Sequence, residues 1–74
     1  MMKKTYKMVD LECAHCAAKM EDAIKKLPGV SNASVSFLTQ KLTIEGDDAQ
    51  FDQLVQQAVA ICKKVEPDCE VLVK

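Results

Sequence analysis

The chain has 74 residues, of which 49% are hydrophobic and 28% are charged, and its formal net charge is −1. This length allows one domain at most, and the composition is that of a globular protein rather than a disordered one. With one tyrosine, two phenylalanines, no tryptophan and no excess of positive charge, the chain offers neither a basic stripe nor a base-stacking platform, so no nucleic-acid partner is expected.

The N-terminal segment, Met1 to Thr5, is basic and leads into residues of alternating character rather than into a continuous apolar block. We therefore expect no secretory signal and a cytoplasmic location. In a reducing compartment the four cysteines are predicted to be thiols rather than a disulfide framework. The longest apolar run, Ala58 to Cys62, is far below the ~18 residues of a membrane span, so direct membrane insertion is not expected.

A Cys-x-x-Cys motif, Cys13 to Cys16, lies between a predicted strand, Thr5 to Leu11, and a predicted helix that begins near His15. Cys16 falls in the first helical turn, where unpaired backbone N–H groups and the positive end of the helix dipole favour a thiolate. Two thiolates at this spacing can close on one soft metal ion, and the same pair can serve thiol redox chemistry. The motif alone leaves both function classes open.

The predicted helix is amphipathic and ends at Pro28-Gly29, which stops it and turns the chain. Two alternating segments, Val30 to Phe37 and Lys41 to Glu45, are then joined by the short link Leu38 to Gln40, and together they predict a β-hairpin. Gly46 to Asp48 breaks the alternation and supplies acidic residues for a second helix start.

Apolar residues recur at helical spacing from Phe51 to Val65, and Pro67 ends this second helix. A last alternating segment, Cys69 to Val73, predicts a final strand. The order strand, helix, strand, strand, helix, strand predicts an α+β fold of the ferredoxin-like βαββαβ type, with a four-stranded antiparallel sheet and two helices on one face. We expect one domain over residues 1–74.

In this topology three connecting loops meet at one end of the domain, which is the predicted working surface. They are the loop of Cys13, the hairpin at Leu38 and the loop Val65 to Asp68. The two other cysteines, Cys62 and Cys69, fall in phase with the apolar positions of their elements. Because a free cysteine packs like a small apolar residue, we predict that both belong to the core.

The segments Leu11 to Cys16, Leu27 to Val30 and Lys41 to Ile44 together resemble the heavy-metal-associated domain, whose pattern is Gly-Met-x-Cys-x-x-Cys after a first strand. The resemblance covers nearly the whole chain. It implies a metal-carrying module, used either as a soluble metallochaperone or as the N-terminal domain of a P-type metal-transporting ATPase. Members of the family handle copper(I), or zinc, cadmium and lead, and a related protein carries mercury.

The chain departs from that pattern at three positions. Asp10 replaces the usual glycine, Leu11 replaces the usual methionine, and Glu12 replaces the threonine of copper-binding members. An acidic residue before the first cysteine, with the ending Lys63 to Asp68, is similar to the branch that transports zinc, cadmium and lead. The resemblance therefore favours one zinc, cadmium or lead ion, with copper(I) as the alternative.

The predicted metal ligands are Cys13 and Cys16. Zinc prefers four ligands and accepts carboxylate oxygen and imidazole nitrogen beside sulfur, so Glu12 and His15 are candidate additional ligands. For both residues the competing interpretation is a solvated side chain that only tunes the local charge. Asp10 is expected to stabilise its turn rather than to bind metal.

The predicted function is to bind one soft metal ion and to transfer it by ligand exchange to another thiolate-bearing metal-transport domain or to an ATPase core. No acid–base pair, activated nucleophile or phosphate loop is recognisable, so we expect no enzymatic activity from this chain, which would be a regulatory domain if it belongs to a cation-transporting ATPase. We expect a monomer, or a dimer bridged by metal. The alternatives are a small cytosolic thiol-disulfide oxidoreductase and a docking domain that uses metal only to hold its loop.

Overall fold

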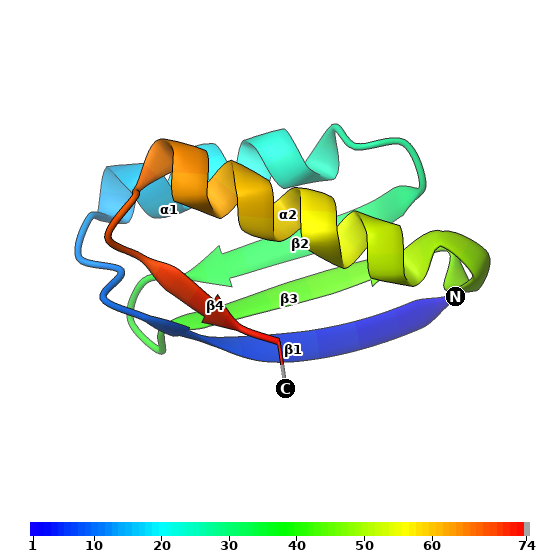
Figure 1. The fold of residues 1–74 in the computed structure, drawn as a ribbon, viewed down its shortest axis with the longest axis horizontal. Helices are drawn as coiled ribbons and strands as arrows, with labels where there is room; N and C mark the ends of the chain where they lie inside the picture. The colour runs from blue at the N-terminus through cyan, green and yellow to red at the C-terminus, as the bar shows by residue number, and fades with distance from the viewer. Residues whose placement is uncertain (74) are drawn as a thin grey trace.

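A four-stranded antiparallel sheet forms one layer of the molecule and two helices cover one of its faces (Figure 1). The computed structural model describes residues 1–73. The strand order is β2-β3-β1-β4, which confirms the predicted ferredoxin-like sandwich. The elements are β1 (Met2–Val9), α1 (Ala14–Lys25), β2 (Val30–Ser36), β3 (Lys41–Gly46), the short 3-10 helix η1 (Asp48–Gln50), α2 (Phe51–Val65) and β4 (Glu70–Leu72).

The limits of β1 and β4 differ from the predicted ones. β1 begins at Met2 rather than at Thr5, because it pairs with β3 along its whole first part, from Met2 opposite Gly46 to Lys7 opposite Lys41. It ends at Val9 rather than at Leu11, because Asp10 adopts a left-handed backbone conformation with φ of 63°. β4 is shorter than predicted. It pairs only with the last three residues of β1, Lys7 to Val9.

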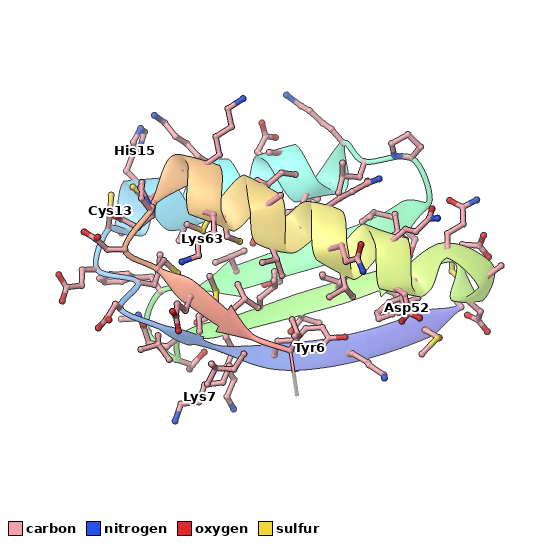
Figure 2. The ribbon with its side chains drawn as sticks, viewed as in Figure 1. Tyr6, Lys7, Cys13, His15, Asp52 and Lys63 are labelled. Carbon is pink, nitrogen blue, oxygen red and sulfur yellow. The ribbon has the colours of Figure 1, made fainter. Side chains whose placement is uncertain are left out.

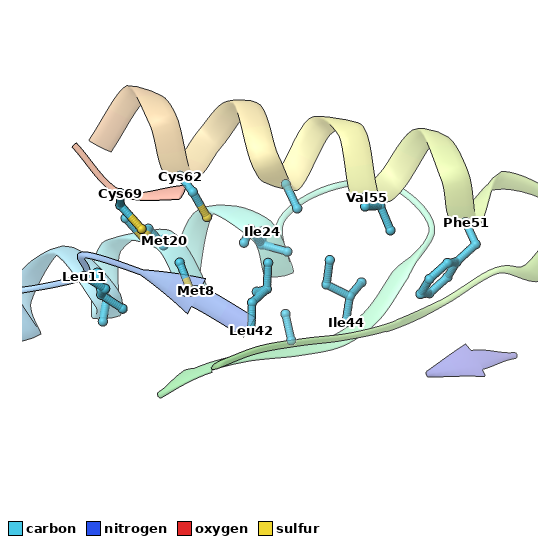
Figure 3. Close-up of a cluster of buried hydrophobic side chains, with 13 residues drawn as sticks. Met8, Leu11, Met20, Ile24, Leu42, Ile44, Phe51, Val55, Cys62 and Cys69 are labelled. Carbon is cyan, nitrogen blue, oxygen red and sulfur yellow. The ribbon is translucent and has the colours of Figure 1, made fainter. Parts of the chain in front are cut away.

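The core lies between the sheet and the two helices (Figure 3). α1 contributes Met20 and Ile24, which are completely buried, and the inner face of the sheet contributes Leu42 and Ile44. Burying each large apolar side chain stabilises the fold by roughly 1.5–3 kcal/mol. The two layers therefore hold the helix that begins at the Cys-x-x-Cys motif firmly against the sheet.

Cys62 and Cys69 are completely buried among these apolar side chains, which confirms their predicted place in the core (Figure 3). Burial raises the pKa of the Cys62 thiol to about 12, and burial also raises the pKa of Cys69. Both thiols are therefore neutral at physiological pH and behave as small apolar groups.

The end of the molecule opposite the cysteine motif is closed by two glycines. Gly29 has φ of 97°, and its carbonyl oxygen accepts a hydrogen bond from the Asp47 N–H at 3.0 Å. A Cβ atom on Gly46 would lie 2.6 Å from the same carbonyl oxygen. The turn after α1 can therefore approach β3 only because position 46 has no side chain.

Within residues 1–73, none of the helices combines the length and the apolar character needed to cross a membrane.

Candidate metal site

The two cysteines of the motif lie at the start of α1, one before the helix and one in its first turn. Cys13 is the N-cap residue, and its Sγ accepts a hydrogen bond from the Cys16 backbone N–H at 3.1 Å. The Cys13 carbonyl oxygen accepts the first helical hydrogen bond, from Ala17 N–H at 3.0 Å. Both thiols are partly exposed at this end of the molecule, where Figure 2 shows Cys13 at the edge of the fold. The helix start therefore fixes the two sulfur atoms close together at the surface.

The two thiols ionise very differently because they interact with each other. Hydrogen bonds from the Cys16 side chain and backbone lower the pKa of Cys13. The same hydrogen bond between the side chains, together with desolvation, raises the pKa of Cys16 to about 11. The first proton therefore leaves from Cys13, and its thiolate lies at the helix N-terminus in the form that binds a soft metal.

One carboxylate beside this pair belongs to Glu66, which the sequence interpretation did not name as a site residue. Its Oε2 lies 3.9 Å from the Cys16 Sγ. Glu66 follows the last residue of α2, where its N–H donates to the Cys62 carbonyl at 2.9 Å and its carbonyl accepts from Cys69 N–H at 3.0 Å. These two backbone hydrogen bonds hold the loop in the position that places the Glu66 carboxylate beside the cysteine pair.

The other two candidate ligands have exposed side chains. Glu12 and His15 are both exposed, and Figure 2 shows the His15 ring projecting outward from the start of α1. In the described part of the chain, no three His, Cys, Asp or Glu side chains are grouped closely enough to hold a metal ion. Ligation by Glu12 or His15 therefore stays a prediction that would require these side chains to turn inward, and ligation by Glu66 would likewise require its carboxylate to move closer to both sulfur atoms.

The three loops predicted to share one end of the domain do meet there. The turn that contains Leu38 is joined to β1 by the hydrogen bond from Met8 N–H to the Gln40 carbonyl, at 2.7 Å. The loop after α2 meets the start of α1 through Glu66 and Cys16. This end therefore combines two soft sulfur donors with one carboxylate and leaves the sulfurs accessible, which is the donor chemistry of a site for soft or borderline cations.

The comparison with known families agrees with this arrangement. The profile of the heavy-metal-associated domain matches residues 5–67, which is most of the chain. The chain belongs to the heavy-metal-associated domain family.

Its relatives in the family include a metal-transporting ATPase and a copper chaperone. A zinc/cadmium/lead-transporting P-type ATPase of Shigella sonnei is 39% identical over 57 residues, which cover 73% of this chain but only 8% of that protein. The copper chaperone CopZ of Enterococcus hirae is 28% identical over 64 residues, and the match covers 86% of both chains. This heavy-metal-associated domain thus corresponds to one small part of the ATPases and to nearly the whole of the chaperone.

Solved structures of the family share the fold. The structure of a CopZ metallochaperone superposes with a TM-score of 0.75 at 20% identity and covers 96% of this chain and 100% of that one. At this identity the likeness establishes the ferredoxin-like fold alone.

Proposed function

We propose that this heavy-metal-associated domain binds one soft metal ion through the thiolates of Cys13 and Cys16 and passes it to another thiolate site. The observation that supports this most strongly is the helix start itself, where the Cys16 N–H lies 3.1 Å from the Cys13 sulfur. A hydrogen bond of this kind stabilises an anionic sulfur before any metal arrives. Family membership and the names of the relatives point to the same chemistry.

Transfer is proposed to proceed by ligand exchange at the exposed end of the domain. A thiolate of the receiving protein forms a bond to the metal first, and the bond from Cys13 or Cys16 then breaks, so the ion is never free. No change of oxidation state is involved, and the thiolates that are released take up protons from water. The receiving site is a second thiolate-bearing transport domain or the core of an ATPase, on the cytoplasmic side.

For the metal, we propose zinc, cadmium or lead, with copper(I) as the alternative. Copper(I) is satisfied by two thiolates, whereas zinc prefers four ligands and accepts carboxylate oxygen beside sulfur. Glu66 is the proposed oxygen donor, because its Oε2 lies 3.9 Å from the Cys16 sulfur. Glu12, which directly precedes Cys13, is the alternative donor.

The first test is a cadmium titration followed by the charge-transfer absorption of the cadmium–thiolate bonds. The wild type should bind one equivalent, and the double variant Cys13→Ser, Cys16→Ser should bind none while keeping the wild-type circular dichroism spectrum. Cys62→Ala, which removes one of the buried thiols, serves as the matched control and should still bind one equivalent. Stoichiometric binding by the double variant would overturn the assignment.

A second test compares Glu66→Gln with Glu12→Gln. If the Glu66 carboxylate is a ligand, Glu66→Gln should weaken zinc binding by about ten- to a hundredfold, the effect of losing one charged contact, and should change copper(I) binding much less. Glu12→Gln should leave the zinc-to-copper affinity ratio close to that of the wild type. Competition with chelators of known affinity under anaerobic conditions gives this ratio, and the opposite ranking of the two variants would make Glu12 the ligand.

The lowered pKa of Cys13 also favours a second candidate function, thiol–disulfide exchange by the same pair. Two measurements separate the functions. A carrier binds metal tightly at one equivalent and shows no exchange activity with a disulfide substrate, whereas an oxidoreductase reduces that substrate catalytically and binds metal weakly.

A further inference from the structure

Gln40 joins the β2–β3 turn to the loop that carries Cys13. Its side-chain Oε1 accepts a hydrogen bond from the Leu11 N–H at 3.0 Å, and its Nε2 donates to the Leu11 carbonyl at 2.5 Å. Nε2 also donates to the Phe37 carbonyl, at 2.9 Å. One amide group therefore satisfies both backbone groups of Leu11, as a neighbouring strand would do.

Leu11 is the buried residue of the metal-binding loop, between the end of β1 and Cys13. The loop leaves β1 at Asp10 and reaches the helix cap at Cys13, two residues beyond Leu11. The Leu11 side chain is buried, with 2% of its surface exposed, while its neighbour Glu12 is exposed. Within residues 1–73, the hydrogen bonds that tie residues 10–12 to other parts of the chain all go to Gln40.

The backbone at Gln40 is in an unfavourable conformation for this residue type. Its φ is 56°, in the left-handed region that glycine and asparagine adopt more easily. Glutamine therefore weakens the turn locally, and its side-chain contacts with Leu11 offset that effect. Strain of this kind persists where the surrounding contacts over-determine the conformation, which often happens at functional sites.

We propose that Gln40 is a positioning residue for the metal site. It holds Leu11, and through Leu11 it keeps the Cys13 sulfur close enough to the Cys16 sulfur for both to bind one metal ion. This inference rests on the proposed metal-binding function. With the amide in place, the metal-free loop already has the conformation that binds metal. Without it, only a fraction of the molecules are competent at any moment, and the apparent affinity falls by that fraction.

The decisive variant is Gln40→Gly. It removes the amide but also relieves the left-handed backbone, so the two effects on stability oppose each other and the protein should still fold, while cadmium binding should become about tenfold weaker, the equivalent of one to two neutral hydrogen bonds. Transfer of cadmium to a competing chelator should be faster by a similar factor. Gln40→Asn, which also suits a positive φ but is too short to reach Leu11, should behave in the same way. Ser36→Ala is the matched control, because it removes only the hydrogen bond to Thr39 N–H within the same turn and should leave the metal affinity unchanged.

Hydrogen exchange of the metal-free protein separates this proposal from the proposed function. The Leu11 amide should be protected in the wild type and in Ser36→Ala, and it should exchange rapidly in Gln40→Gly and Gln40→Asn. If the wild type bound no metal, the metal-binding function would fail whatever Leu11 did. If the wild type bound cadmium and Leu11 lost its protection in both variants without any change in affinity or transfer rate, the role of Gln40 would be refuted. Retained protection of Leu11 in both variants would also refute it.

Discussion

Asp10 shows at the scale of one residue why the family pattern has glycine before the metal-binding loop. Its φ of 63° lies in the left-handed region, which most residues other than glycine, asparagine and aspartate avoid. This conformation ends β1 and turns the chain so that Leu11 enters the core with 2% of its surface exposed. Aspartate is among the side chains that tolerate this region best, so the loop keeps its shape without glycine.

Substitutions at position 10 test this explanation. Asp10→Gly should be more stable than Asp10→Ala by about 1 kcal/mol, because alanine has the full steric conflict at positive φ. The free energies of unfolding are measured by urea titration. Asp47, which is also exposed but has φ of −64°, is the control position, and there glycine should be no more stable than alanine. Equal stabilities of the two variants at position 10 would contradict the explanation.

At the scale of the elements, the sequence predicted what depends on local periodicity. Both helices, the hairpin and the last strand are where the pattern of apolar residues placed them, and Cys16 lies in the first helical turn as expected. Two features of the site were not predictable in this way. The approach of Glu66 to Cys16 joins residues 50 positions apart, and the contact of Gln40 with Leu11 joins residues 29 positions apart. Such contacts depend on how loops pack at the end of the fold, which periodicity does not encode.

The start of α1 also controls how metal binding depends on pH. A metal ion must displace the protons of both thiols, so the affinity should rise with pH until both are ionised. Hydrogen bonding lowers the pKa of Cys13, while that of Cys16 is raised to about 11. Between these two values binding releases one proton, and below the pKa of Cys13 it releases two.

The expected result is a break in the pH dependence. The cadmium affinity should rise about a hundredfold per pH unit below the pKa of Cys13 and about tenfold per unit above it, up to about pH 11. Chelator competition at a series of pH values measures both slopes, and the break gives the pKa of Cys13. Two independent thiols of ordinary pKa would instead keep the steeper slope up to about pH 8.5.

At the scale of the whole molecule, the metal end and the opposite end have separate roles. Three loops form the metal end, and none of them includes the close approach between Gly29 and Gly46. That approach closes the far end of the sandwich, where β3 also meets the beginning of β1 at Met2. Damage there should therefore lower stability without changing the cysteine pair.

Gly46→Ala tests this separation. The added Cβ would lie 2.6 Å from the Gly29 carbonyl oxygen and 2.9 Å from a Leu54 methyl group. Overpacking of this kind should lower the free energy of unfolding by about 1–3 kcal/mol. The cadmium affinity of the folded protein, measured well below the unfolding temperature, should stay within about twofold of the wild type. A twofold change corresponds to a free energy of RT ln 2, which is smaller than that of one hydrogen bond, so no contact at the metal end would have been lost. A large loss of affinity would show that the two ends are coupled. Asn32→Ala, an exposed change opposite Glu45 on the neighbouring strand, is the control for both measurements.

The short β4 has a consequence for how this protein meets other molecules. Because β4 covers β1 only from Lys7 to Val9, the outer edge of β1 is uncovered from Met2 to Tyr6 in the described part of the chain. An open strand edge is a template for edge-to-edge aggregation. Here, however, Lys4 stands opposite the buried Ile44 and so points to the helix-covered face, although its side chain is exposed. A foreign strand adding to this edge would have to enclose the Lys4 ammonium group, and the desolvation of that charge opposes self-association.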